Sequence, residues 1–111
     1  MTLAAGRLRH RVVIQERVLT QDADLEPIYA WADVATVWAA IEPLSVREFI
    51  AARAQQSEVS ARITIRYRAG LNGQMRILHN GKVYNPAGFL ADKDSGLEYL
   101  TVPVSEGAND G

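Results

Sequence analysis

Hydrophobic and polar residues alternate along several segments of the chain with a period of two, the pattern of a β-strand with one buried face. The clearest case is residues 58–68, where every second residue is apolar or aromatic. These positions are Val59, Ala61, Ile63, Ile65 and Tyr67. Residues 9–18 alternate less regularly and predict a first strand. Residues 35–44 predict a second strand, which ends at Pro43 because proline has no N–H to donate to a ladder.

A short helix is predicted over residues 46–54, between the second and third strands. Ser45 and Glu48 have the S-x-x-E spacing of a capping box, in which each side chain accepts from the other residue's backbone N–H. Leu44 and Phe49 stand at the two positions of a hydrophobic staple, and apolar residues continue at helical spacing. We therefore expect the helix to lie across an open end or face of the sheet.

Asn80-Gly81 separates two apolar segments and predicts a β-hairpin, because a type I′ turn needs positive φ at both central residues. The turn sets the pairs His79 with Lys82, Ile77 with Tyr84 and Met75 with Pro86. Pro86 should lie at an edge or end its strand. A turn at residues 94–96 then leads into a last strand over residues 97–104.

Residues 19–33 follow the first strand without a steady period, and we interpret them as a long loop. The loop contains Asp22, Asp24, Glu26 and Pro27, as well as Ile28, Tyr29 and Trp31. In a monomer the apolar groups would fold back over the barrel, whereas in an assembly they would reach a neighbouring subunit. The sequence leaves both interpretations open.

Together these segments make six strands, with one helix inserted between the second and third. Antiparallel neighbours at this spacing predict a mainly β fold, a small antiparallel β-barrel or sandwich. We expect a single domain over residues 1–111, with flexible ends at residues 1–7 and 105–111.

Composition narrows the function classes. The 111 residues are 48% hydrophobic and 23% charged, which is ordinary for a globular protein. No apolar run approaches the ~20 residues of a membrane span, and the start lacks the apolar core of a secretory signal, so we expect no membrane partner. The absence of cysteine excludes disulfides and thiolate chemistry and fits a reducing compartment. A formal net charge of -1 gives no general attraction for nucleic acid.

No constellation of catalytic or metal-ligating residues is visible. His10 and His79 each lie in a predicted strand without a second histidine, a cysteine or a patterned carboxylate nearby, and we interpret both as ordinary strand residues. The glycines are scattered through turns rather than gathered into a phosphate-binding loop, and no serine has the context of a nucleophile elbow. We expect no enzymatic activity, no cofactor and no metal.

Three arginines, Arg62, Arg66 and Arg68, form a cationic row on the polar face of the strand over residues 58–68. Such a row either pairs with carboxylates, such as Glu58 or Glu98, or meets the phosphates of DNA. The alternation puts Tyr67 on the opposite face from these arginines, which favours the first interpretation. In a ring subunit the row would line the channel or meet an acidic neighbour.

Four sequence motifs occur in the order typical of one phage family. GRLRHRVVIQERV (6–18) resembles the opening pattern G-x-L-x-x-R-V-x-I-Q, and WADVATVWAAIEPL (31–44) resembles W-x-D-V-x-x-V-W-A-x-I-x-P-L. An acidic residue in a short helix follows, here Glu48. EVSARITIRYR (58–68) is similar to E-x-x-x-x-I-x-I-R-Y-R, and a hairpin with a Gly and a Tyr continues the likeness. From about residue 8 to residue 104 the chain resembles the phage head-tail joining family, also called head-tail adaptor or head-closure proteins.

Two segments depart from the family pattern. The first loop of the family carries a D-x-x-G turn, where this chain has Leu25 in place of the glycine after Asp22, so we expect a different loop tip. After Tyr84 the family continues with an aliphatic strand, which residues 85–88 (NPAG) interrupt here.

The resemblance implies a ring subunit, in a ring expected to be hexameric, that docks beneath the portal protein, helps to close the DNA-filled head and provides the tail attachment surface. Its partners would be further copies of itself, the portal protein, a tail-side joining or tail-terminator protein and packaged DNA in the channel. It would be assembled in the host cytoplasm, from a phage or prophage gene, and end in the neck of the virion.

Within this resemblance we hypothesise that residues 20–33 and 46–54 make the subunit and portal contacts, because the barrel needs them least. The candidate interface residues are Asp22, Asp24, Glu26, Tyr29, Trp31, Arg47 and Arg53. The candidate DNA-facing or channel-facing residues are Arg62, Arg66 and Arg68. We expect Phe49 to pack through its staple rather than dock a partner, and Trp38 to be structural.

Two alternative functions stay open. A tail-completion or tail-terminator ring subunit would share the fold and the lack of catalysis, but it would copurify with tails. A small nucleic-acid-binding β-barrel would bind DNA alone with a steep salt dependence.

Overall fold

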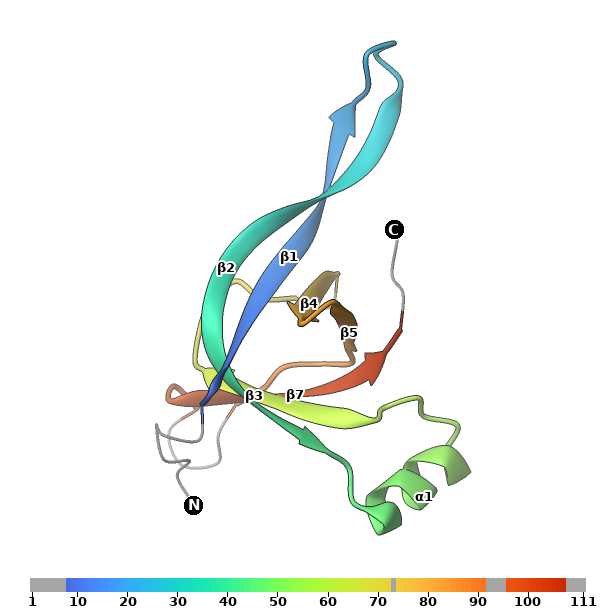
Figure 1. Cartoon of the computed structure of the whole chain (residues 1–111), viewed down its shortest axis with the longest axis vertical. Helices are drawn as coiled ribbons and strands as arrows, with labels where there is room; N and C mark the ends of the chain where they lie inside the picture. The colour runs from blue at the N-terminus through green and yellow to red at the C-terminus, as the bar shows by residue number, and fades with distance from the viewer. Residues whose placement is uncertain (1–7, 73, 92–95, 108–111) are drawn as a thin grey trace.

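The structure is a computed structural model, and it describes residues 8–72, 74–91 and 96–107. One helix and seven strands make up this part of the chain: β1 (His10–Gln21), β2 (Pro27–Pro43), α1 (Val46–Ala54), β3 (Ala61–Arg66), β4 (Met75–His79), β5 (Lys82–Pro86), β6 (Leu90–Ala91) and β7 (Tyr99–Glu106). All strand pairs are antiparallel. The strands follow the order β3-β2-β1-β4-β5-β7-β6, and β3 also pairs with β7 (Figure 1). That pairing closes a small barrel and confirms the predicted fold class.

The strands depart from the expected six by one short element. β6 has two residues and pairs only with β7 among the described strands, so it adds to the edge of β7 and is not one of the strands that close the barrel. β5 ends at Pro86 as predicted. Of the predicted hairpin pairs, His79 with Lys82 and Ile77 with Tyr84 are confirmed. The third is wrong: Met75 pairs with Glu16, and Pro86 with Val104, because β5 leaves β4 to join β7.

The core lies inside the barrel and follows the alternation of the strands. Ile63 and Ile65 on β3 are fully buried, as their spacing predicted. The largest fully buried side chains are Ile14, Ile63, Ile65, Ile77, Val12, Val102 and Val104. Each such side chain contributes about 1.5–3 kcal/mol by leaving water, a gain that offsets part of the conformational entropy lost on folding.

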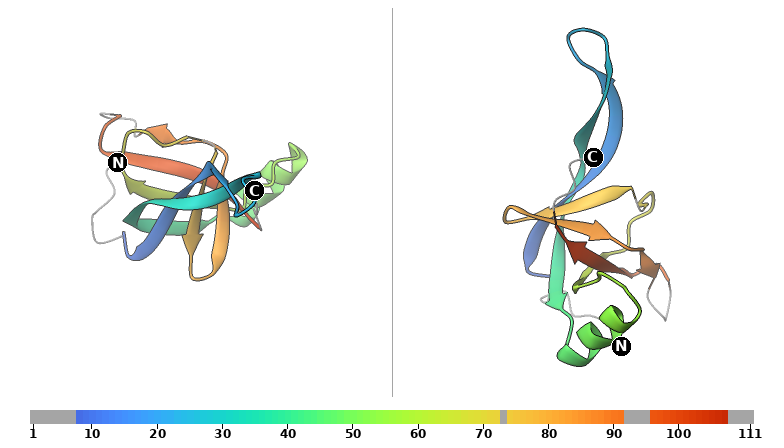
Figure 2. Two further views of the ribbon diagram at one scale, coloured as in Figure 1. Left: turned by 90° about the horizontal axis from the view of Figure 1, so that it is seen from above. Right: turned by 90° about the vertical axis from the view of Figure 1, so that its right-hand side faces the viewer.

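The prediction of a long loop over residues 19–33 is wrong. β1 and β2 continue through it as a two-stranded arm that extends beyond the barrel to a turn at residues 22–26 (Figure 1). Figure 2 shows the twisted ribbon of the arm from two further directions, and the described chain measures 52 × 31 × 24 Å. Only the tip of the predicted loop is a loop.

A β-bulge in β2 interrupts the alternation of apolar and polar residues, so the sequence pattern did not predict the arm. Ile14 pairs with Ala35 and Gln15 with Asp33, so Val34 is an extra residue on β2. Paired residues share a face, so the inward positions of β2 are odd-numbered from 35 to 39 and even-numbered at 30 and 32. A strict period of two therefore fails across residues 30–39 although the chain is extended throughout.

The helix α1 forms as predicted but does not cover the sheet. Ser45 and Glu48 make both hydrogen bonds of the capping box, with the Glu48 N–H donating to Ser45 Oγ at 3.2 Å. No residue of α1 is buried, and the helix stands off one end of the barrel, opposite the arm (Figures 1 and 2). The expectation that it would lie across the sheet is wrong, because its apolar positions face solvent.

At the C-terminal end β7 runs to Glu106. Ser105 and Glu106 were expected in a flexible end, but Ser105 pairs with Asn85 and Glu106 with Tyr84. The predicted flexible residues 1–7 and 108–111, and Asp94 and Ser95 of the predicted turn, lie outside the described residues.

Candidate functional site

The turn at the tip of the arm brings three predicted interface residues together. Asp22 Oδ1 accepts from the backbone N–H groups of Asp24 and Glu26, each at 2.9 Å, which closes the turn. Leu25 donates its N–H to the Asp22 carbonyl at 3.0 Å and has φ 62°, a left-handed conformation that favours glycine. Its side chain is 72% exposed. The tip thus presents one apolar side chain among three carboxylates.

The outer face of the arm carries aromatic rings covered by arginines. The Arg17 guanidinium lies 4.1 Å from the ring centre of Tyr29, and that of Arg76 lies 4.2 Å from the ring centre of Trp31. Gln15 donates to Asp33 Oδ1 at 2.7 Å and accepts from Arg76 at 2.9 Å. These contacts stiffen the ribbon where it leaves the barrel. Tyr29 and Trp31, both predicted interface residues, therefore also hold the arm together.

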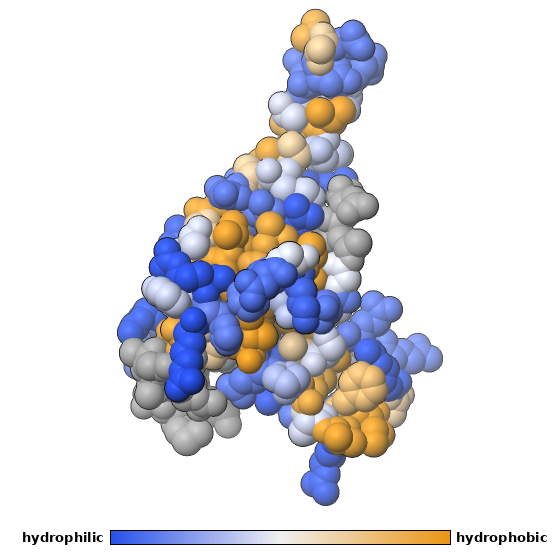
Figure 3. All heavy atoms as spheres, viewed as in Figure 1, coloured by the Kyte–Doolittle hydropathy of each residue, from blue (hydrophilic) through white to orange (hydrophobic). Residues whose placement is uncertain are grey.

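The helix α1 presents an apolar surface to solvent, composed of Val46, Phe49 and Ile50. We call this surface the helix patch; it appears at the lower right of the space-filling view (Figure 3). Phe49, expected to pack through its staple, is 44% exposed, and the Arg53 guanidinium lies 4.6 Å from its ring centre. The predicted interface residue Arg47 is also exposed on this helix.

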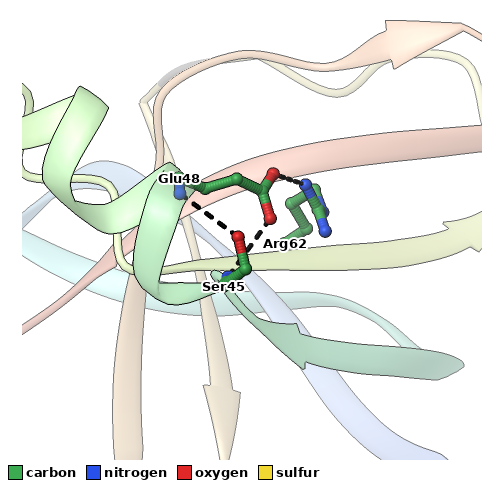
Figure 4. Close-up of polar contacts among 3 residues, drawn as sticks. All are labelled: Ser45, Glu48 and Arg62. Carbon is green, nitrogen blue, oxygen red and sulfur yellow. Dashed lines mark hydrogen bonds and ion pairs between the residues drawn. The ribbon is translucent and has the colours of Figure 1, made fainter.

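The predicted arginine row is divided between two environments. Arg62 forms an ion pair with Glu48 of α1 (Figure 4), which agrees with a carboxylate partner but not with a free DNA-facing residue. Hydrogen bonds from the Ser45 backbone, then from the Arg62 and Ser45 side chains, hold the pKa of Glu48 below its usual value. Arg62 therefore anchors the helix to the barrel.

Arg66 and Arg68 instead line a cavity of about 260 Å³. Its other lining residues are Leu8, Arg11, Thr36, Val37, Trp38 and Tyr67. We call it the arginine cavity. Tyr67 was predicted on the opposite face, but β3 ends at Arg66 and the alternation does not extend to residue 67. Trp38, expected to be structural, is half exposed and stacks under Arg11, whose guanidinium lies 4.8 Å from the ring centre.

The two histidines are neighbours in space. The rings of His10 and His79 meet edge to face, with centroids 5.0 Å apart, although the sequence predicted no second histidine near either. Burial lowers the pKa of His79, and the charges of His10 and Lys82 lower it further. In the described part of the chain no three His, Cys, Asp or Glu side chains gather closely enough to hold a metal ion. None of its helices has the length and apolar character to cross a membrane.

Sequence reasoning missed Arg11, Trp38 and Leu25 as surface residues of interest. The strand pattern does place Arg11 on an outer face, but only the pairing of β1 with β2 sets it on Trp38. Leu25 carried a signal, because it replaces the glycine of the D-x-x-G turn.

The family model described as "Phage head completion protein" matches residues 3–107. The head completion protein gp7 of Enterobacteria phage HK97 is 29% identical over 72 residues, which are 65% of this chain. The chain spans 64% of the length of that curated relative.

Two solved structures are similar over nearly the whole chain. Protein SF1141 from Shigella flexneri 2a is 32% identical, with a TM-score of 0.73 over 97% of this chain and all of that one. A chain of the virion of a native gene transfer agent particle is 16% identical, with a TM-score of 0.57 over 93% of this chain and 98% of that one. The second likeness is one of fold alone.

Proposed function

Because the chain belongs to the phage head completion protein family, we propose that it is a structural subunit of a connector ring, which docks below the portal protein and helps to close the DNA-filled head. The ring then provides the surface to which the tail attaches. It acts by binding, without chemical turnover. The subunit is assembled in the host cytoplasm and ends in the neck of the particle.

The observation that carries this proposal is the pair of projections on a small closed barrel. The arm and α1 leave the barrel at opposite ends of its long axis (Figure 1), and each exposes apolar side chains. Leu25 at the tip is 72% exposed and Val46 on the helix is 78% exposed. A barrel with its own core gains nothing from these groups, whereas burial against another chain would remove their apolar surface from water.

The two projections divide the contacts that a ring subunit needs. The arm carries the acidic group Asp22, Asp24 and Glu26, together with Tyr29 and Trp31, and we assign it to contacts between neighbouring subunits. The helix patch, flanked by Arg47 and Arg53, is assigned to the portal side or the tail side of the ring. Asymmetric contacts of this kind generate rings when the rotation between subunits closes.

DNA binding is a second candidate, supported by the arginine cavity. Its three guanidinium groups and the rings of Trp38 and Tyr67 are the residue types that hold single-stranded nucleic acid. The engagement of Arg62 by Glu48 weakens this candidate, since it removes one member of the predicted row. A DNA-binding barrel would lose affinity steeply with added salt, and Arg66→Ala would flatten that dependence.

The test is electron microscopy of lysates from a phage whose genome encodes the chain, after deletion of its gene, with the gene restored from a plasmid as the control. Loss of the ring should leave complete tails separate from heads, and some heads should leak DNA. Normal infectious particles would contradict the proposal. Copurification of the chain with free tails rather than filled heads would instead favour the tail-completion alternative.

A sharper version uses the helix patch. Ile50→Ser removes an exposed apolar group, so the fold should change in stability by no more than about 0.5 kcal/mol. The variant should nonetheless fail to restore infectivity. Ala51→Ser on the same helix, also exposed, is the matched control and should restore it. Full complementation by Ile50→Ser would remove α1 from the set of docking surfaces.

A further inference from the structure

The arginine cavity is lined by three arginines that have no carboxylate partner in the described part of the chain. They are Arg11, Arg66 and Arg68, and the first two each contact an aromatic ring. Between them lies apolar and aromatic surface from residues that include Trp38 and Tyr67. Such a site favours an occupant with an apolar centre and anionic surroundings.

The size of the cavity indicates what kind of group fits. Its volume of about 260 Å³ is below the roughly 300–1,000 Å³ of pockets that bind small molecules. A single protruding side chain suits such a space better than a cofactor or a nucleoside does.

The tip of the arm has the complementary features. Leu25 projects from the turn with 72% of its surface exposed. Asp24 and Glu26 flank it, are exposed, and make no ion pair within the described residues. The tip therefore offers one apolar side chain and two carboxylates without ion-pair partners. The cavity offers an apolar pocket and three guanidinium groups without carboxylate partners.

A chain cannot place its tip in its own cavity. Arg11 pairs with Trp38 at the barrel end of the β1–β2 ladder, whereas Gln21 pairs with Pro27 beside the tip. These two pairs are ten residues apart along β1, roughly 33 Å at about 3.3 Å per residue. The occupant must come from another molecule.

We propose that the arginine cavity of each copy receives the arm tip of a second copy, with Leu25 in the cavity and Asp24 and Glu26 on its arginines. This inference deepens the proposed ring function and rests on it. Because the two surfaces differ, the contact is heterologous, so every added copy leaves one tip and one cavity free until the ring closes.

The absence of cysteine allows a direct test with single-cysteine variants. Purified Leu25→Cys and Arg68→Cys chains are mixed and treated with a short bis-maleimide. The mixture should give a covalent dimer, and neither variant alone should do so. Leu25→Cys mixed with Arg47→Cys, an exposed arginine on α1, is the matched control and should give a yield about tenfold lower. Equal yields, or a dimer from Leu25→Cys alone, would overturn the proposal.

Charge reversal tests the same contact without relying on cysteine at the cavity. In the Leu25→Cys and Arg66→Cys pair, adding Arg68→Glu to the cavity copy should lower the cross-linked yield about tenfold, the loss of one close charge pair. Adding Asp24→Arg to the tip copy should restore most of it. Should Arg68→Glu leave the yield unchanged but abolish binding to a single-stranded oligonucleotide, the cavity belongs to DNA and the inference fails.

A third experiment places Leu25→Cys and Arg68→Cys in one chain and expresses that chain in the phage whose own gene is deleted. It tests the tip-to-cavity contact and the ring function separately. Immunoblots of purified particles report whether the chain is in the virion, and cross-linking of those particles reports whether tip meets cavity. A ladder of covalent oligomers supports both. A chain that is present but not linked overturns the inference alone. Absence from the particles overturns the ring function, and the purified chains then decide whether copies contact one another.

Discussion

The Glu48 carboxylate on α1 accepts a hydrogen bond from the Arg62 guanidinium on β3 and another from the Ser45 backbone N–H, the latter at 3.1 Å (Figure 4). One carboxylate thus both caps the helix and ties it to the barrel. Most helices are held in place by apolar packing, but no residue of α1 is buried. The hydrogen bonds of Glu48 therefore hold α1 against the barrel.

Arg62→Ala should release the helix without unfolding the barrel. The ion pair is more than a third exposed on both sides, so the midpoint of global denaturation should change little. The amides of α1 should exchange with solvent faster, because local opening becomes easier. Lys82→Ala, which breaks the exposed pair with Glu106, is the control and should leave α1 exchange unchanged. Unaltered exchange in Arg62→Ala would contradict the anchoring role.

The same site predicts a loss of helix stability in acid. The pKa of Glu48 is lowered in the fold, so its stabilising effect is complete above its ordinary pKa of about 4.5 and disappears as the pH falls through the lower folded value. Glu48→Gln keeps the capping geometry but lacks the charge. Circular dichroism and α1 amide exchange should therefore separate the wild type from the variant at pH 7, and the two should converge once the pH falls below the lowered pKa of Glu48 in the fold. A constant difference at all pH values would argue against this assignment.

Leu25→Gly should stabilise the arm. Leu25 has φ 62°, and a side chain in that conformation costs about 1–2 kcal/mol that glycine avoids. We expect slower amide exchange in the turn and an increase of about 1 kcal/mol in the free energy of unfolding. Ala23→Gly, in the same turn with negative φ, is the control and should not stabilise the fold. If tip insertion between copies is correct, Leu25→Gly also loses that contact although its fold is more stable.

Gly81→Ala should destabilise the β4–β5 hairpin. Gly81 has φ 78° and a Cβ there would meet nothing within 4 Å, so the cost, about 1 kcal/mol, comes from the backbone alone. Gly88→Ala also has free space and no positive φ, and it should be close to neutral. Denaturant titrations of the two variants should differ by that amount, and equal midpoints would show that the turn is not held in the type I′ conformation.

The lowered pKa of His79 predicts a second pH range, above that of Glu48, in which the stability of the fold changes. Its pKa is lowered in the fold, chiefly by burial, so the unfolded chain binds more protons once the pH drops below the ordinary value of about 6.5. Stability should therefore fall as the pH drops below about 6.5 and level off below the lowered pKa of His79 in the fold. His79→Gln should flatten this part of the profile of melting temperature against pH, and His10→Gln should flatten it less. A profile that is the same in His79→Gln would contradict a lowered pKa for His79 in the fold.

Local chemistry predicted several elements from the sequence alone. The capping box at Ser45, the turn at Asn80-Gly81 and the buried face of β3 each depend on residues within a few positions of one another. The arm is an element that these local patterns did not predict. One bulged residue, Val34, shifts the alternation of β2, so a continuous strand looked like a loop.

The candidate surfaces were predicted less well than the fold. The sequence placed the tip acids and the helix in an interface, but it grouped Arg62 with Arg66 and Arg68. The structure pairs Arg62 with a helix that precedes it and leaves the other two beside Arg11, which lies more than fifty residues earlier in the chain. No spacing along a strand reports such a neighbour.

The sequence by itself determined the fold class, the short capped helix and the family resemblance, because periodicity, caps and turns act over a few residues. Only the tertiary structure decided that residues 19–33 belong to an arm, that α1 leaves its apolar side in solvent, and that three arginines surround a cavity. Each of these depends on strand pairs and on closure of β3 against β7, which join residues far apart in the chain. Local patterns fix how each segment folds, and long-range pairing fixes which segments meet.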